Sequence, residues 1–94
     1  MKLLLKTIER EKTKLEFING RELEVDYNGP NELLLIDEEL KIVVDSNEVY
    51  DAISKYSDHV YELYKEYYNK KIDKEYTEFE LYLHEKINSI LKPQ

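Results

Sequence analysis

The sequence predicts an α+β fold, in which an antiparallel meander sheet of four to five strands precedes two C-terminal helices packed on one of its faces. In the first half, apolar and charged residues alternate, which is typical of strands with one buried face. In the second half, apolar residues recur every three or four positions, which is typical of amphipathic helices. A chain of 94 residues is a single domain, so we expect residues 1–45 to form the sheet and residues 46–92 the helical pair.

The first three predicted strands alternate most clearly, and they cover residues 2–7, 13–17 and 21–27. Asn19 and Gly20, between the last two strands, indicate a hairpin. A three-residue loop over residues 18–20, with Gly20 in the left-handed region, keeps the apolar side chains of both strands on one face. This register places Leu15 opposite Leu23.

Two more strands are expected after the turn at residues 28–31. Residues 33–36 and 40–44 are apolar on both faces, so they belong in the middle of the sheet or on a face that a partner covers. The acidic segment between them, residues 37–39, is expected to be an exposed turn. Residues 45–48 have the spacing of a capping box that begins with Asp in place of Ser or Thr, and they predict the start of the first helix.

The first predicted helix carries two stripes of large side chains. The first stripe is expected to pack on the sheet and consists of Val49, Ile53, Tyr56, Val60, Leu63 and Tyr67. The second stripe lies about 100° round the helix and consists of Tyr50, Tyr61, Tyr64 and Tyr68. These tyrosines either pack in the core or face a partner, because tyrosine buries a large area while its hydroxyl group stays hydrated.

The second helix is expected after a break in the pattern at residues 69–73, with an apolar stripe over residues 76–90. Thr77 and Glu80 have the spacing of a capping box at its start. Part of residues 76–83 also alternates between apolar and polar side chains. This segment therefore stays open between helix and strand.

The residue types needed for catalysis or metal binding are scarce. The chain has no Cys and two Gly, which excludes thiolate chemistry and glycine-rich phosphate loops. His59 with Glu62, or Glu80 with His84, would place two metal ligands on one helix face, but solvent-facing polar residues are the simpler interpretation. We therefore expect no enzyme activity, no cofactor and no metal.

No apolar run approaches the roughly 20 residues of a membrane span, and we expect a cytoplasmic protein without a membrane partner.

Negative charge is concentrated in residues 16–51, which carry eleven carboxylates and two basic residues. The whole chain has a net charge of −7, which argues against direct binding of nucleic acid. One interpretation of this negative charge is a solvated surface that prevents a small protein from aggregating. The other is a surface that docks on a basic partner. Such a surface resembles, in charge only, those of proteins that imitate the phosphate array of nucleic acid.

The expected function is therefore non-enzymatic protein binding. We expect an inhibitor, encoded by a phage or another mobile element, that occludes a basic nucleic-acid-binding site, as anti-CRISPR or anti-restriction inhibitors do. The abundance of residues with AT-rich codons indicates an AT-rich genome, such as that of a low-GC bacterium or one of its phages. The alternative is a homo-oligomeric regulatory or structural domain, with a homodimer that buries the apolar strands. The predicted partner-binding residues are Glu16, Glu22, Asp37, Glu38, Glu39, Asp45, Glu48, Asp51, Tyr61 and Tyr64.

Overall fold

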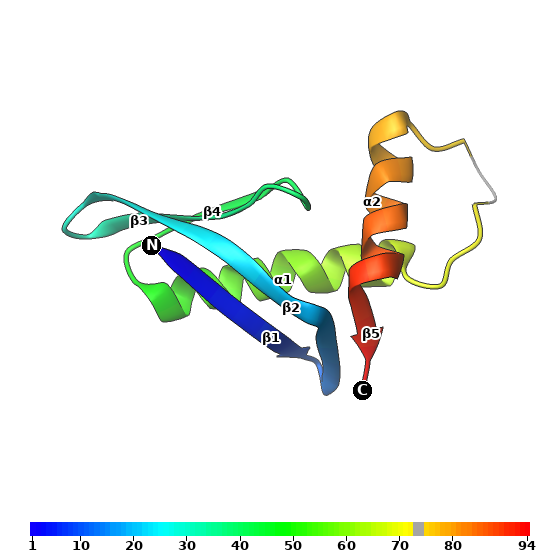
Figure 1. The fold of residues 1–94 in the computed structure, drawn as a ribbon, viewed down its shortest axis with the longest axis horizontal. Coiled ribbons are helices and arrows are strands. Elements are labelled where there is room, and N and C mark those ends of the chain that lie inside the picture. The colour runs from blue at the N-terminus through cyan, green and yellow to red at the C-terminus, as the bar shows by residue number, and fades with distance from the viewer. Residues whose placement is uncertain (73–74) are drawn as a thin grey trace.

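The computed structural model describes residues 1–72 and 75–94 (Figure 1). Its elements are β1 (Lys2–Arg10), β2 (Thr13–Gly29), β3 (Glu32–Asp37), β4 (Ile42–Ser46), α1 (Val49–Tyr67), α2 (Glu78–Ile90) and β5 (Leu91–Pro93). The strands form one antiparallel sheet in the order β1-β2-β3-β4, and β5 pairs with β2. The predicted α+β fold, an antiparallel meander followed by two helices, is confirmed. Neither helix is long and apolar enough to cross a membrane within the described residues.

The turn between β1 and β2 lies at a different place from the predicted hairpin. It falls at Glu11 and Lys12, whose φ angles are 49° and 66°. The hairpin predicted at residues 18–20 is wrong, because β1 supplies the cross-strand partners of both Leu15 and Leu23. The two leucines therefore do not lie opposite each other, although both are buried. Side-chain parity is the same in both arrangements, so the alternation could not distinguish them.

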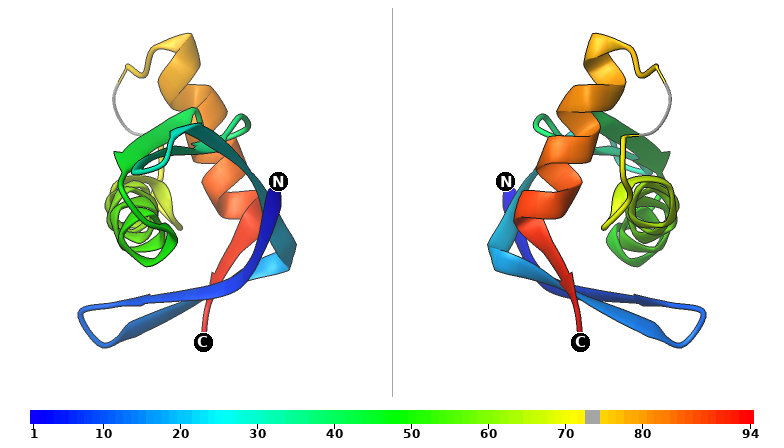
Figure 2. Two further views of the ribbon diagram at one scale, coloured as in Figure 1. Left: turned by 90° about the vertical axis from the view of Figure 1, so that its left-hand side faces the viewer. Right: turned by 90° about the vertical axis from the view of Figure 1, so that its right-hand side faces the viewer.

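A sharp bend divides β2, and with it the sheet, into two halves. Asn19 and Gly20 have φ angles of 67° and 76°, and the register with β1 shifts between Leu5 and Thr7. Before the bend β2 pairs with β1 and β5, and after it with β1 and β3. Figure 2 shows how the β1–β2 ribbon turns a corner and curls around the helices. The predicted positive φ of Gly20 is confirmed, but it bends a strand rather than closing a hairpin.

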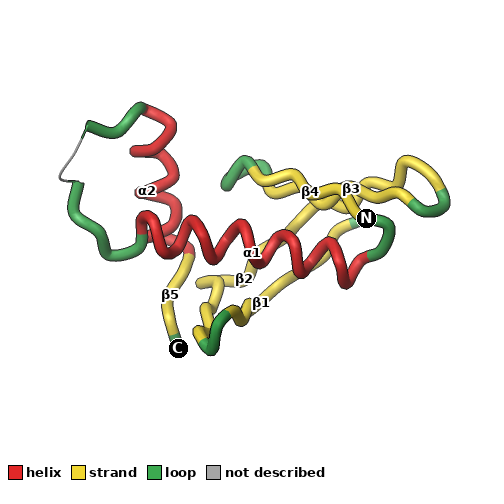
Figure 3. The backbone as a smooth tube through the Cα atoms, turned by 180° about the vertical axis from the view of Figure 1, so that it is seen from behind, coloured by secondary structure: helices red, strands yellow, loops and turns green. Residues whose placement is uncertain are grey.

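The helices cover the inner face of the curled sheet, and α1 crosses the strands in Figure 3. The predicted apolar stripe of α1 is confirmed: Tyr56, Val60 and Tyr67 are buried, and the other members pack partly buried against the core. The sheet and α2 complete this core with Leu15, Phe17, Leu23, Val25, Leu33, Leu35, Val44, Leu83 and Ile87. Burial of these apolar side chains is the main force that holds the helices to the sheet.

The N-cap of α1 lies three residues after the predicted N-cap, Asp45. Asp45 still belongs to β4, and Glu48 is the N-cap, whose Oε1 accepts a hydrogen bond of 2.6 Å from the Asp51 amide. The capping box therefore does not begin at Asp45. The strand continues for longer than the sequence pattern suggested, because Ser46 still pairs with Leu33.

The predicted capping box at Thr77 and Glu80 is confirmed. The Thr77 hydroxyl accepts from the Glu80 amide at 3.1 Å, and the Glu80 carboxylate accepts from the Thr77 amide at 3.0 Å. The open segment 76–83 thus contains the start of α2. The helical pair predicted up to residue 92 is shorter, because residues 91–93 form β5 and pair with β2.

The bend at Gly20 generates a test of this fold. We expect Gly20→Ala to destabilise the protein by about 1 kcal/mol or more, because Gly20 has positive φ and a Cβ there would lie 3.0 Å from Leu4 Cδ1. Gly29→Ala is the matched control, since a Cβ at Gly29 meets no atom within 4 Å. Urea unfolding measures both variants. Equal stability of the two variants would contradict the assigned bend.

Candidate functional site

The face of the sheet that turns away from the helices carries carboxylates and apolar side chains side by side. Residues directly opposite on neighbouring strands share a face. Glu24, Ile36 and Val43 form one such row across three strands, and Asp26, Leu34 and Asp45 form the next. With the pair Leu4 and Glu22, we call this set the outer face: Leu4, Glu22, Glu24, Asp26, Leu34, Ile36, Val43 and Asp45.

The apolar members of the outer face are open to solvent. Leu4 and Val43 are 58% and 59% exposed, and Leu34 and Ile36 are half-buried. Of the acidic members, Glu22, Asp26 and Asp45 are exposed and Glu24 is half-buried. An exposed apolar patch with a polar surround is typical of a protein-binding surface.

The electrostatic balance of the outer face is negative. Lys2 is its neighbouring cation, with Nζ 3.0 Å from the Glu22 carboxylate and 3.8 Å from that of Glu24. The hydrogen bond to Glu22 raises the pKa of Lys2, but an ion pair this exposed contributes little to stability. Asp26 and Asp45 form no ion pair within the described residues. The four carboxylates of the outer face therefore outweigh one cation.

The predicted partner-binding residues do not form one surface. Glu22 and Asp45 belong to the outer face, and exposed Glu38 borders the same depression of about 240 Å³ as Glu22. Glu16 lies before the bend of β2, in the other half of the sheet, where its carboxylate accepts from Gln94 at 2.5 Å and lies 3.9 Å from Lys92 Nζ. The prediction thus combined residues from the two halves of the sheet.

Glu48 and Asp51 contribute to the start of α1. Glu48 is the N-cap, and the Asp51 carboxylate accepts from the Ser46 hydroxyl at 2.6 Å and lies 3.2 Å from Lys55 Nζ. The hydrogen bond from Ser46 is the main cause that lowers the pKa of Asp51. Both carboxylates have structural roles at a helix N-terminus, where negative charge is favourable.

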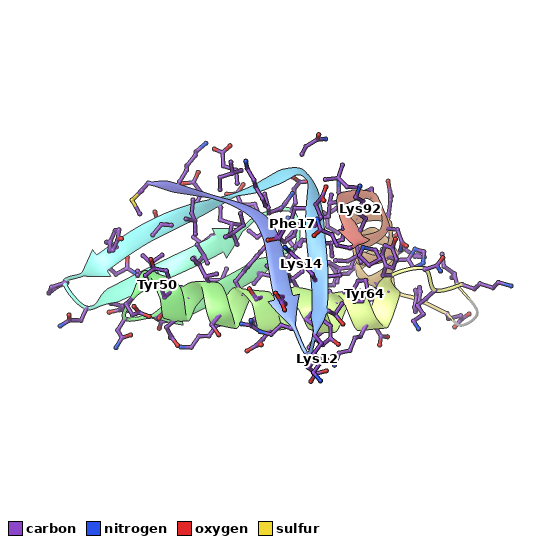
Figure 4. The ribbon with its side chains drawn as sticks, turned by 90° about the horizontal axis from the view of Figure 1, so that it is seen from below. Lys12, Lys14, Phe17, Tyr50, Tyr64 and Lys92 are labelled. Atoms are coloured by element: carbon purple, nitrogen blue, oxygen red, sulfur yellow. The ribbon has the colours of Figure 1, made fainter. Side chains whose placement is uncertain are left out.

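The tyrosine stripe lies on the helix side of the molecule. Tyr61, Tyr64 and Tyr68 stack in sequence, with ring centroids 6.2 Å and 5.0 Å apart. Tyr61 also donates a hydrogen bond of 3.2 Å to Glu11 in the β1–β2 turn. Figure 4 shows Tyr64 on α1 beside this hairpin, whose tip carries Lys12. The stack packs partly buried against the core and is not continuous with the outer face.

Asp37 is buried, so the expectation that residues 37–39 are exposed is wrong for this residue. Its side chain is 1% exposed. Its carboxylate accepts two hydrogen bonds from the Arg21 guanidinium, at 2.6 Å and 2.9 Å, and one from the Tyr56 hydroxyl at 2.6 Å. The Leu40 amide donates a fourth, at 3.1 Å. All four of these hydrogen bonds are donated by the protein itself, so the contacts of Asp37 are structural.

The environment of Asp37 keeps it ionised. Burial alone would raise its pKa, but the hydrogen bonds from Arg21, Tyr56 and the Leu40 amide outweigh burial and lower it. The bond to Asp37 raises the pKa of Arg21, and burial next to this carboxylate raises that of Tyr56. Glu39 extends the network, with Oε1 3.1 Å from Arg21 and Oε2 3.5 Å from Lys86.

Three of the four helix residues considered as metal ligands have other partners. His84 Nε2 lies at hydrogen-bond distance, 2.8 Å, from the Lys70 carbonyl, and Glu80 belongs to the capping box. Glu62 pairs with Lys65 at 3.0 Å. In residues 1–72 and 75–94, no three His, Asp or Glu side chains are grouped to hold a metal ion.

No protein-family model, curated protein or solved structure matches the chain. Judged by the residues and geometry of the chain itself, the outer face is the best candidate site.

The buried network predicts the effect of two substitutions. We expect Asp37→Asn to destabilise the fold by up to about 3–5 kcal/mol, because it removes the buried counterion of Arg21 and leaves only the exposed Glu39 carboxylate beside the guanidinium. Tyr56→Phe should cost about 1.5–3 kcal/mol, since it removes one hydrogen bond to a charged acceptor. Tyr50→Phe is the control, because Tyr50 is 81% exposed. Urea unfolding measures all three, and a Tyr56→Phe variant as stable as Tyr50→Phe would refute this role of the network.

The same network predicts a pH dependence. The pKa of Asp37 in the folded state is lower than its ordinary value of about 3.9, so the unfolded chain binds the proton more readily. The stabilisation is complete above that ordinary value and is lost as the pH falls through the lower folded-state pKa. We therefore expect the stability difference between the wild type and Tyr56→Phe to narrow below about pH 4. Urea unfolding from neutral to acidic pH tests this, and a constant difference would contradict it.

Proposed function

We propose that the protein is a non-enzymatic binding domain that docks through its outer face on a basic surface of a nucleic-acid-handling protein and occludes it. The observation that carries this proposal is the exposed sheet face in which four carboxylates lie beside four aliphatic side chains. In this proposal the chain acts as an inhibitor of the kind that phages and other mobile elements encode.

The composition of the outer face supports a protein as the partner. Nucleic acid would bring further negative charge to a chain with a net charge of −7. A small hydrophilic ligand would make no apolar contact with Leu4 and Val43. A basic protein surface satisfies both features, because its cations face the carboxylates and its apolar side chains, or the stems of Lys and Arg, cover the aliphatic groups.

The spacing of the carboxylates supports a partner that binds phosphates. Glu22, Glu24 and Asp26 alternate along β2, so they recur about every 6.8 Å. They therefore place three negative charges in one line along a single strand, as phosphates follow one another along a nucleic-acid strand.

Self-association through the same face is a weaker candidate. A second copy would place four carboxylates against four, and like charges facing each other in an interface are unfavourable. The homo-oligomeric alternative therefore requires another surface. The mass of the protein in solution, measured by light scattering, distinguishes it from a monomeric inhibitor.

A charge-reversal experiment tests the proposed function. The partner is captured from the source cell with the tagged protein and then purified, and nucleic acid should compete for it. We expect Glu24→Lys with Asp26→Lys to weaken this association at least about tenfold, because it places two cations against a basic groove. Binding of the wild type should also weaken as salt increases from about 50 to about 500 mM. Isothermal titration measures both effects.

The matched control is Glu9→Lys with Glu85→Lys, which changes the net charge equally at exposed residues outside the outer face. This control should retain most of the affinity, and both double variants should remain folded. An affinity for the partner that changes neither with salt nor with the Glu24 and Asp26 substitutions would refute docking through the outer face.

A further inference from the structure

β4 forms a free edge of the sheet next to the outer face. Within the described residues it pairs with β3 and with no other strand. In the left view of Figure 2, β4 is the outermost strand above α1, which is seen end-on. The backbone groups of β4 that point away from β3 are therefore open to an additional strand.

The contacts of β4 identify these outward groups. The Asp45 carbonyl accepts a hydrogen bond of 2.9 Å from Lys55 Nζ, a side chain of α1 rather than a group of β3. In an antiparallel ladder, residues two positions apart direct their N–H and C=O groups to the same side. The amide and carbonyl of Val43 therefore also face the free edge, whereas those of Val44 and Ser46 face β3.

The two edge strands of the sheet differ in their protection. β1 contains Lys2 and Lys6, and its register is interrupted between Leu5 and Thr7. Lysines and bulges of this kind prevent a further strand from pairing with an edge. β4 is regular, contains neither Lys nor Pro, and exposes 59% of Val43. Lys55 of α1 occupies the outward Asp45 carbonyl, so this edge is open to pairing at Val43.

The charges around β4 indicate what would pair with it. Exposed carboxylates lie at both ends of the strand, with Asp45 and Glu48 at one end and Glu38 at the other. Lys41 and Lys55 are the nearby cations of the turn and of α1. A second copy of this chain would bring the same acidic groups to the edge, which disfavours self-pairing. A segment with positive charge is complementary.

We propose that the partner contributes an extended segment of alternating basic and apolar residues, which pairs with β4 as an additional strand of the sheet. This inference rests on the proposed function, because it adds a backbone contact to the docking of the outer face. Main-chain hydrogen bonds to Val43 supply the register, and alternate side chains of the segment lie beside Val43 and Asp45 on the outer face.

Amide hydrogen exchange with a synthetic probe tests the strand pairing. The probe is a peptide of alternating Lys and Val, and the control peptide has Glu in place of Lys. In the free protein, the Val43 amide should exchange rapidly and the Val44 amide slowly. Saturation with the Lys–Val peptide should slow exchange at Val43 at least about tenfold, and the Glu–Val peptide should not. Unchanged exchange at Val43 under saturation would overturn the proposal.

A proline substitution provides the second measurement. Val43→Pro removes an N–H that faces away from β3, so the sheet should keep its ladder while affinity for the Lys–Val peptide falls about tenfold or more. Val43→Thr keeps the N–H and should keep the affinity. Full binding by Val43→Pro would overturn strand pairing. If Val43→Pro binds fully but Glu24→Lys with Asp26→Lys still weakens partner binding, the proposed function stands and only the strand addition fails.

Discussion

The Asp37 carboxylate is the contact on which the rest of the structure depends. It joins Arg21, which follows the bend of β2, to Tyr56 of α1 and to the turn between β3 and β4. A buried ion pair adds little stability compared with apolar packing, but it is costly to leave incomplete. The network therefore ties α1 to the inner face at Tyr56, where apolar burial holds the helices against the sheet.

Sequence reasoning predicted the parts of the fold that depend on local patterns. Alternation predicted the buried side chains of β2, the helical spacing predicted the packed stripe of α1, and Thr77 and Glu80 predicted the start of α2. The same alternation also applies to two charged residues. Arg21 has the parity of the buried residues Leu23 and Val25, and Asp37 has that of Leu33 and Leu35. Extending the rule to charged residues would have predicted the buried pair.

The remaining features depend on contacts between distant residues. A turn at Glu11 and Lys12 contains no glycine, so its residue types do not mark it, and either hairpin position keeps the same parity. The three residues of β5 are too few for a pattern. Carboxylates clustered in the sequence also separate in space: Asp37 is buried, Glu48 caps α1, and Asp45 faces outward. For this reason the residues predicted to bind a partner are scattered in position.

The proposed docking uses the uncovered outer face rather than the tyrosine stack of α1. Cross-saturation NMR of the complex with the captured partner measures this directly, because it reports which amides of this chain lie in the interface. We expect signal loss along β2, β3 and β4 at the residues of the outer face. Signal loss confined to α1 around Tyr61, Tyr64 and Tyr68 would contradict it.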